Sequence, residues 1–379
     1  MELKIGILLP RSDMFPTLAL DFLNGCKLAF KKSMHTSSIP IFIVEGIGTG
    51  AEASMLKTAE KLILQENVDV TIAFCGEHHL AELVKIFDNY KKPLIHVDLG
   101  GFILRKEFNS PHVLHHNLNL WQSAFQSGSF AAQKFGKKVS VIASTYDGGY
   151  HMGAAFSESF GAAGGSVVSY YVSPMDYKTE TFEKMVSEIE AAKPDFIYAI
   201  FSYKEGKKIF DVLSKSKING QIPILAIPLM TDESFNSENL DLENVHSIAS
   251  WSFDDEHVQM KEFVTEYDSS YDGKPTIIGL LGYEVGITLS ECISSEGKVP
   301  SELVEFFKGK SWEAPRGVIS YGTRNESQVT NYKMRKFEFN EVGYHNLVVE
   351  NLDAQIDKKL YEKLEDLPAV AWHNPYICT

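Results

Sequence analysis

The sequence predicts an α/β protein with two lobes, each built on a sheet of mostly parallel strands. Short apolar segments alternate with amphipathic helical segments from residue 3 onward, which is the pattern of a doubly wound sheet. This alternation restarts near residues 117–120 and continues to about residue 227. A chain of 379 residues is also too long for one ordinary hydrophobic core. Together these observations favour two lobes of similar plan.

The stretch between residues 68 and 101 shows the alternation most clearly. Val70–Phe74 is a short apolar run, as expected for a strand that is buried on both faces. A helix and a strand at 94–97 follow, and the apolar stripe of the helix consists of Leu80, Leu83, Val84 and Phe87. Loops 75–79 and 98–101 therefore lie at the carboxyl ends of parallel strands, where open α/β sheets bind ligands. We expect both loops to contact a small ligand.

The remaining elements follow in order along the chain. Before this stretch we expect a strand at 3–9, a helix at 19–30, a strand at 41–44 and a helix at 51–66, and after it an edge strand at 112–114. The second unit should contain helices at 121–132, 150–163, 182–192 and 205–214, with strands at 139–143, 167–172, 196–200 and 224–227. We then expect a strand at 245–251, followed by helices at 256–267, 277–292 and 301–307. Here strands and helices no longer alternate. Residues 332–349 alternate like an antiparallel hairpin, and the tail 360–379 is expected to be packed coil.

Composition and charge exclude several classes of protein. No apolar run approaches 18 residues, so we expect no transmembrane helix. A net charge of −14 disfavours nucleic acid and anionic membrane surfaces as partners. The chain contains no GxSxG motif, P-loop, helix-opening GxGxxG or HExxH motif, so we predict no enzymatic activity and no cofactor.

The cysteines and histidines give no metal-binding pattern. Cys26, Cys75, Cys292 and Cys378 lie far apart, without a CxxC pair or zinc spacing. His78-His79 and His115-His116 are adjacent pairs, whose side chains do not easily point the same way on a helix or strand. A metal site needs three or four ligands to converge, so we predict none.

An ordered series of segments resembles the type I periplasmic solute-binding proteins of ABC transporters, of the branched-chain amino-acid (Leu/Ile/Val) kind. The series consists of Lys4–Pro10, Ala51–Ile72, Val139–Gly153, Asp176–Tyr198, Gly317 and the strands at 332–339 and 347–349. The resemblance implies two Rossmann-like lobes joined by a three-crossing hinge, with crossings near 118–120, 250–253 and 324–330. Lobe 1 would comprise residues 1–119 and 252–326, and lobe 2 residues 120–251 and 327–379. The ligand would bind in the cleft between the lobes, which would close on it.

The same resemblance implies a set of ligand-binding residues on the cleft loops. The set is Arg11, Ser12, Cys75, Gly76, Glu77, His78, Asp98, Leu99, Gly100, Tyr146, Tyr150, Tyr203 and Leu229. In amino-acid-binding relatives, hydroxyl groups that hold the ligand carboxylate stand at the positions of Glu77 and Gly100. The segment that supplies an acidic partner for the ligand ammonium corresponds to Ala226–Met230, which has no acid. We therefore do not predict a branched-chain amino acid as the ligand.

Two interpretations of these side chains stay open. In the first, Glu77 and Asp98 face a polar ligand that presents a cation or several donors, while its apolar or aromatic part lies against Tyr150 and Tyr203. In the second, the carboxylates turn away to cap helices, which leaves backbone N–H groups for an anion. The tyrosines would then be ordinary packing residues with hydroxyls that reach solvent.

The predicted function is that of an extracytoplasmic solute-binding protein, which captures a small ligand and delivers it to a membrane permease. We expect a monomer in the periplasm, or a membrane-anchored lipoprotein, whose signal peptide is absent from this sequence. The alternative is the ligand-sensing domain of a cytosolic regulator or receptor with the same fold, which the start at Met1 fits. An enzyme with a cleft between α/β lobes is a third possibility, and a turnover assay separates it from a binding protein.

Overall fold

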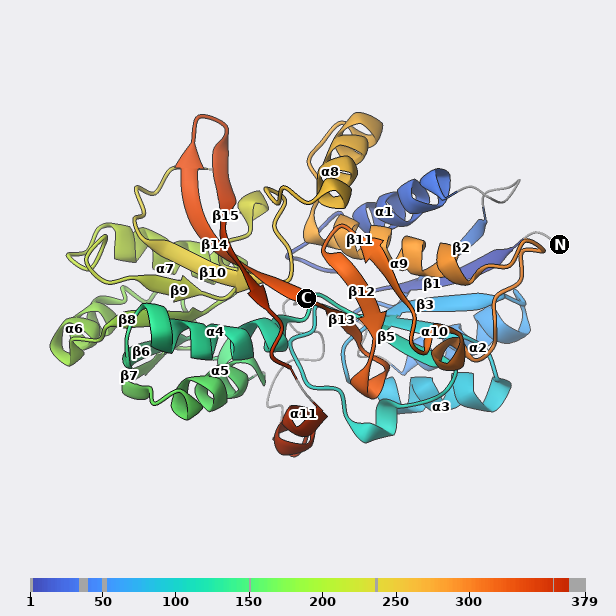
Figure 1. The fold of residues 1–379 in the computed structure, drawn as a ribbon, viewed down its shortest axis with the longest axis horizontal. Coiled ribbons are helices and arrows are strands. Elements are labelled where there is room, and N and C mark those ends of the chain that lie inside the picture. The colour runs from blue at the N-terminus through green and yellow to red at the C-terminus, as the bar shows by residue number, and fades with distance from the viewer. Residues whose placement is uncertain are drawn as a thin grey trace.

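The computed structural model describes residues 3–33, 40–49, 53–149, 151–235, 238–356 and 358–367. Two large sheets form the cores of two separate parts of the molecule, and a small antiparallel sheet lies beside the first of them (Figure 1). The first large sheet is parallel throughout, with the strand order β2-β1-β3-β4-β5. Its strands are β1 (Lys4–Leu9), β2 (Ile41–Gly46), β3 (Val70–Phe74), β4 (Leu94–Val97) and β5 (Val113–His116). We keep the name lobe 1 for the part around this sheet.

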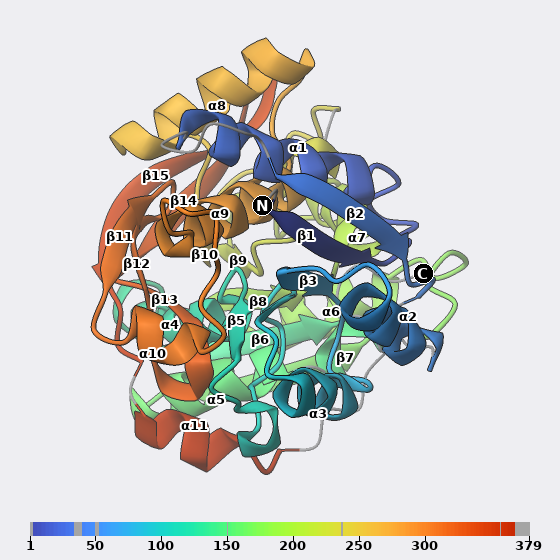
Figure 2. The same cartoon turned by 90° about the vertical axis from the view of Figure 1, so that its right-hand side faces the viewer.

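Helices cover both faces of the lobe 1 sheet. Figure 2 shows α1 (Leu18–Lys32) and α9 (Ile277–Cys292) on one side, and α2 (Ser54–Leu64) and α3 (Leu80–Tyr90) on the other. Further helices of this lobe are η1 (Lys106–Phe108), α8 (Val258–Tyr271), α10 (Leu303–Phe307) and η4 (Thr323–Asn325). The small antiparallel sheet has the order β11-β12-β13, with β11 (Ser311–Ala314), β12 (Gly317–Tyr321) and β13 (Ser327–Val329).

Glycines let α1 and α9 pack backbone to backbone. A Cβ atom on Gly25 would overlap the carbonyl oxygen of Gly279, and one on Gly282 would overlap that of Phe22. The Cys26 thiol donates to the carbonyl oxygen of Gly282 over 3.1 Å, and burial raises the pKa of this thiol. The helices are thus too close for any side chain at these positions.

Gly282→Ala is expected to lower the free energy of unfolding by about 1–3 kcal/mol, because the new methyl group forces two packed helices apart. Gly161→Ala is the matched control, since this glycine is exposed on a helix and its Cβ would meet no atom within 4 Å. The control should gain about 0.5–1 kcal/mol from the better helix propensity of alanine. Urea unfolding curves of both variants measure the difference, and equal stabilities would contradict the close packing.

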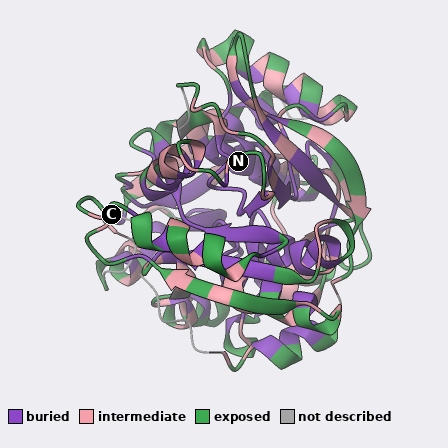
Figure 3. Cartoon of the chain, turned by 90° about the vertical axis from the view of Figure 1, so that its left-hand side faces the viewer, coloured by how far each residue is buried: buried purple, intermediate pink, exposed green. Residues whose placement is uncertain are grey.

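The second large sheet has seven strands in the order β15-β14-β10-β9-β8-β6-β7. Its parallel strands are β6 (Lys138–Ala143), β7 (Ser166–Val172), β8 (Phe196–Ile200), β9 (Ile224–Ala226) and β10 (Val245–Ala249). The hairpin of β14 (Asn331–Asn340) and β15 (Gly343–Asp353) extends the sheet in antiparallel fashion. The inner strand β8 is buried along its length while the edge strand β7 is largely exposed (Figure 3). We keep the name lobe 2 for this part.

Helices also pack on the lobe 2 sheet and lead into its loops. They are α4 (Leu120–Lys134), η2 (Asp147–Gly149), α5 (His151–Ala162), α6 (Glu183–Ala192), α7 (Tyr203–Ser214) and η3 (Glu233–Phe235). The chain runs from β5 of the first sheet into α4, from β10 of the second sheet into α8, and from β13 into β14. These three connections are close to the predicted crossings, and the exact lobe boundaries stay a prediction.

The predicted fold class is confirmed. Val70 and Val141 belong to different sheets, and the residues at 332–349 form an antiparallel addition to the second one. Three short strands, β11, β12 and β13, were absent from the sequence prediction. The prediction of coil from residue 360 is wrong at its start, because α11 (Lys358–Leu364) buries Leu360, Tyr361 and Leu364. Residues 368–379 of the predicted coil lie outside the described residues.

Candidate functional site

The loops at the carboxyl ends of the two sheets meet between the lobes. The ring of Phe15, in the loop after β1, lies edge-on to the ring of Tyr203 at the start of α7, with 4.9 Å between centroids. The backbone N–H of Ile103, in the segment after β4, donates to Nδ1 of His151 at the start of α5 over 2.8 Å. Each contact joins lobe 1 to lobe 2. The candidate site consists of these loops, which meet across the boundary between the lobes.

Asp98 follows β4 and is the most buried acid among the predicted ligand residues, with 4% of its surface exposed. Its Oδ1 atom has no hydrogen-bond partner among the described residues. Burial raises the pKa of Asp98 to about 8, against the opposing effect of hydrogen bonding from the Gly100 N–H and the Asn117 side chain. A carboxyl group with this pKa carries its proton at neutral pH.

Gly100 belongs to the same loop and connects it to the first crossing. Its φ is +81°, in the left-handed region that favours glycine, and its carbonyl oxygen accepts from the N–H of Trp121 over 2.8 Å. A Cβ atom here would collide with Asn117 and Asn119. Leu99, beside it, is buried. The loop that carries Asp98 is therefore fixed directly against the hinge.

Glu77 is half-buried in the loop after β3 and forms a loose ion pair with Arg105, with 3.7 Å between Oε2 and Nη2. Burial raises its pKa, and the Arg105 charge opposes the shift. Helix α3 has no side-chain N-cap, so Glu77 does not cap it. Cys75 and Gly76 are buried, whereas His78 is exposed and stacks its ring edge-on against His79.

In the loop after β1, the side chain of Ser12 forms hydrogen bonds within the loop itself. Ser12 is buried, and its hydroxyl oxygen accepts from the N–H groups of Met14 and Phe15 over 3.2 and 2.9 Å. This turn presents the Phe15 ring to Tyr203. Arg11 is exposed at the start of the loop, and its backbone N–H donates to the carbonyl oxygen of Gly48.

On lobe 2, the predicted residues occupy different environments. Tyr203 is buried at the start of α7, with a φ of +34°. Tyr146 is half-buried after β6, and its hydroxyl donates to the carbonyl oxygen of Met175 over 3.4 Å. Leu229 is fully buried in the core of the lobe. Tyr150 lies outside the described residues.

Two acids of lobe 2 were missed by the sequence reasoning. Asp147, after β6, is 2% exposed; its Oδ2 accepts from the N–H of Ser202 over 2.7 Å, while Oδ1 has no partner among the described residues. Glu205, in the first turn of α7, accepts from the Ser173 hydroxyl. Burial and the nearby Glu205 charge raise the pKa of Asp147 to about 7. Their positions just after predicted strands at 139–143 and 196–200 were the available signal.

His151 joins three segments and is a neutral imidazole. Its Nδ1 accepts the N–H of Ile103, so the proton resides on Nε2, which donates to the carbonyl oxygen of Leu367 over 3.1 Å. Burial lowers its pKa, although the hydrogen bond to Leu367 opposes the shift. This histidine fastens α5 of lobe 2 to the loop of lobe 1 without adding charge to the cleft.

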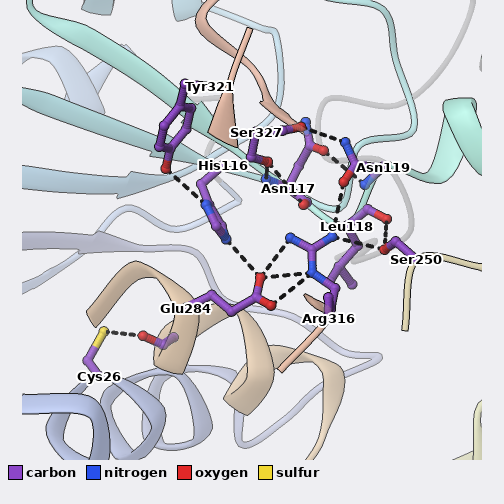
Figure 4. Close-up of polar contacts among 11 residues, drawn as sticks. Cys26, His116, Asn117, Leu118, Asn119, Ser250, Glu284, Arg316, Tyr321 and Ser327 are labelled. Atoms are coloured by element: carbon purple, nitrogen blue, oxygen red, sulfur yellow. Dashed lines mark hydrogen bonds and ion pairs between the residues drawn. The ribbon is translucent and has the colours of Figure 1, made fainter. Parts of the chain in front are cut away.

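A buried ion pair lies beside the connections between the lobes (Figure 4). The Arg316 Nε atom donates to both oxygens of Glu284, over 3.0 and 2.8 Å, and both side chains are fully buried. His116 Nε2 donates to Glu284 over 3.1 Å, and its Nδ1 accepts from the Tyr321 hydroxyl over 3.0 Å. Arg316 Nη1 also donates to Asn119 and Ser250, over 3.0 and 2.9 Å. The pair thus contacts two of the three connections between the lobes.

The third connection is held by side chains of the first one. Asn117 Nδ2 donates to Glu326 over 2.8 Å, and Asn119 Nδ2 donates to the carbonyl oxygen of Ser327 over 2.8 Å. The second connection is bonded to the first as well, because the Ser250 hydroxyl donates to the carbonyl oxygen of Leu118 over 2.7 Å. All three connections therefore share one buried polar network, visible in Figure 4.

A cavity of about 630 Å³ opens between the hairpin tip of lobe 2 and α8 of lobe 1, which face each other in Figure 1. Its polar walls come from both lobes, with acids at Asp232, Glu233, Asp254 and Asp268 and bases at Lys274 and His345. His345 pairs with Asp254 over 3.0 Å. Because its walls belong to both lobes, any change in their relative position changes this volume.

Two histidines of the lobe 1 sheet form a buried pair. His96 and His115 lie on neighbouring strands with 3.0 Å between their Nδ1 atoms, and burial lowers the pKa of His96 to about 4 and that of His115 to about 3. In the described part of the chain, no group of three or more His, Cys, Asp or Glu side chains is placed to hold a metal ion. No described helix has the length and apolar character that spanning a membrane requires.

The architecture and the site together define the class of protein. Two α/β lobes joined by three connections, with loops that meet at the carboxyl ends of their strands, are the plan of a two-lobed binding protein. The family model described as periplasmic binding protein matches residues 2–341. The chain belongs to the periplasmic binding protein family.

Known relatives agree with this assignment. The Leu/Ile/Val-binding protein homolog 6 of Brucella abortus (strain 2308) is 22% identical over 375 residues, which cover 94% of this chain and 93% of that protein. An ABC transporter substrate-binding protein from Sphaerobacter thermophilus has a TM-score of 0.80 at 19% identity, covering 93% of this chain and 98% of that one. A solute-binding protein from Rhodopseudomonas palustris BisB5, in complex with 3,4-dihydroxybenzoic acid, has a TM-score of 0.77 at 24% identity, covering 95% and 99%.

Proposed function

We propose that this protein is the solute-binding component of an ABC transporter, which captures a small polar ligand between its lobes and delivers it to a membrane permease. The meeting of Phe15 with Tyr203, and of Ile103 with His151, carries this proposal, because loops that touch across a cleft can enclose a small molecule. Relatives named as transporter solute-binding proteins support it. The proposed protein works as a monomer in the periplasm, or on a lipid anchor, and catalyses no reaction.

The proposed ligand site consists of the cleft loops and the residues predicted on them. Asp98 and Glu77 supply acceptors from lobe 1, and Tyr203 with Phe15 supplies an aromatic wall. A thermal-shift screen over amino acids, amines, sugars, nucleosides and aromatic acids tests for capture. A ligand at 100 times its dissociation constant should add about 2.7 kcal/mol to the free energy of unfolding. The absence of any stabilising compound, or the appearance of turnover, would count against the proposal.

Closure is expected to accompany ligand binding. Lobe 1 (1–119 and 252–326) and lobe 2 (120–251 and 327–379) should move as rigid bodies about the three connections, and the radius of gyration should fall. Small-angle X-ray scattering, with and without the best compound from the screen, measures this change. An unchanged radius at saturation would argue against hinge closure. Size-exclusion chromatography with light scattering tests the monomer.

A further inference from the structure

We infer that residues 358–367 form a strap that fastens lobe 2 to lobe 1 and favours the arrangement in which the loops of the candidate site touch. This C-terminal strap consists of α11 and the three residues after it, and the chain reaches it from β15 of lobe 2. Figure 1 shows α11 at the lower edge of the molecule, between α5 of lobe 2 and α3 of lobe 1. The inference goes beyond the proposed function, because it concerns how the lobes are held and needs no ligand.

The strap is anchored on lobe 2 by a buried aromatic contact. Tyr361 is 1% exposed, and its ring lies edge-on to the ring of Trp121 in α4, with 5.0 Å between centroids. An ion pair between Lys363 and Glu158 of α5 adds a second contact with the same lobe. Separation of Tyr361 from Trp121 would expose two large aromatic side chains to water, so α11 stays with lobe 2 when the lobes move.

The strap is held to lobe 1 by one carboxylate between two basic side chains. Glu365 Oε1 lies 2.7 Å from Lys106 Nζ in η1, and Oε2 pairs with Arg324 in η4. The side chains of Glu365 and Arg324 are only 14% and 8% exposed, so salt screens this pair less than an open surface pair. Both basic residues belong to lobe 1. A rotation of lobe 1 away from lobe 2 therefore pulls them from Glu365.

The strap is also bonded to the connections between the lobes. The Tyr361 hydroxyl donates to Oε2 of Glu326, which is fully buried at the third connection. The other oxygen of Glu326 accepts from Asn117 at the first connection over 2.8 Å. The strap thus joins the polar network of the connections as well as both lobes.

The end of the strap reaches the contact between the loops of the candidate site. The Leu367 carbonyl oxygen accepts from Nε2 of His151 over 3.1 Å, which fixes the tautomer of this histidine. Nδ1 of His151 is then free to accept the Ile103 N–H of lobe 1 over 2.8 Å. The strap therefore holds in place the imidazole that joins the two lobes beside the candidate site.

These contacts exist only while the lobes keep their present arrangement. An interaction that is made in one arrangement and lost in another shifts the population toward the first. We therefore expect a weakened strap to let the lobes separate more often, without unfolding either of them.

Hydrogen exchange followed by mass spectrometry measures this separation, read at peptides that cover Ile103 and β3. The Ile103 N–H is bonded across the lobe boundary, whereas the N–H groups of β3 are bonded inside the lobe 1 sheet. Glu365→Gln should raise exchange at Ile103 about threefold or more, and Glu365→Lys, which places three positive charges together, about tenfold or more. Exchange in β3 should not change. The radius of gyration of Glu365→Lys, measured by small-angle X-ray scattering, should increase.

Matched controls use Glu362, which is exposed on the same helix. Glu362→Gln and Glu362→Lys make the same changes of charge and should leave exchange at Ile103 and the radius of gyration unchanged. Unaltered exchange at Ile103 in both Glu365 variants, or an equal rise in β3, would overturn the inference. Faster exchange at Ile103 with an unchanged radius would also overturn it, since only the loop would have loosened. None of these readouts involves a ligand, so failure of the proposed capture function is a separate result.

Discussion

Replacing Arg316 by methionine is expected to lower the free energy of unfolding by about 3–5 kcal/mol, the scale for breaking a fully buried ion pair. The variant leaves Glu284 buried with His116 as its remaining partner. It also removes the donor from which the Asn119 and Ser250 side-chain oxygens accept. Both side chains of the pair are fully buried, so water does not replace the lost bonds. Urea unfolding, followed by circular dichroism, measures the loss.

Two control variants separate this effect from a general loss of charge. Lys184→Met breaks an exposed pair with Glu188 and should change stability by less than about 0.5 kcal/mol. The double variant Arg316→Met with Glu284→Leu should recover part of the loss, because no unpaired charge stays buried. A loss below about 1 kcal/mol in the single variant would show that the network does not stabilise the hinge.

Because of the same ion pair, the stability of the folded protein should depend on pH in a defined direction. Burial would raise the pKa of Glu284, but the Arg316 charge and the His116 hydrogen bond outweigh it and lower the pKa to about 2. A folded-state pKa below the unfolded value of about 4.3 means that the unfolded chain binds the proton first. The stabilisation is therefore complete above about pH 5 and is lost as the pH falls toward 2.

Asp98→Asn is expected to raise the free energy of unfolding by about 2–4 kcal/mol at pH 8.5 while it weakens ligand binding. Burial raises the folded-state pKa of Asp98 to about 8, well above the unfolded value, so the folded protein holds a proton that the unfolded chain releases. That difference costs stability progressively as the pH rises from about 4 to 8. Asparagine keeps an acceptor for the Gly100 N–H and carries no charge.

The increase in the free energy of unfolding of the Asp98→Asn variant should grow as the pH rises. It should be small at pH 4, where the carboxyl group is neutral in the folded state and only about half ionised in the unfolded chain, and largest above pH 8. Asp211→Asn, on an exposed pair, should show a change below about 0.5 kcal/mol at both pH values. Equal gains at pH 4 and pH 8.5, or a loss at pH 8.5, would contradict a raised folded-state pKa for Asp98.

The architecture could be predicted from the sequence because its signals are local. Val70–Phe74 is apolar except for Thr71 and is buried along its length, as expected for a strand covered by helices on both faces, and α9 has the bounds that its apolar run predicts. The short strands β11, β12 and β13 escaped prediction because segments of three to five residues carry too little pattern. Helix α11 escaped because two prolines further along the tail suggested coil.

The site could be predicted only in part. Strand ends identify the loops after β3 and β4, so Glu77 and Asp98 could be named as candidates, and the family resemblance added Tyr203 after β8. Asp147 and Glu205 follow strands in the same way, but nothing in their local sequence distinguishes them from other acids that follow strands. Their special environment comes from burial by segments far along the chain, including Ser202 over Asp147.

The sequence by itself determined two mostly parallel sheets, the helices around them and the loops at their carboxyl ends, because periodicity and apolar runs depend on neighbouring residues. Only the tertiary structure decided which groups meet: the Phe15 ring with Tyr203, the Ile103 backbone N–H with His151, and Arg316 with Glu284. Such contacts depend on how the lobes pack, and the pKa of a carboxyl group such as that of Asp98 depends on what the packing removes from water.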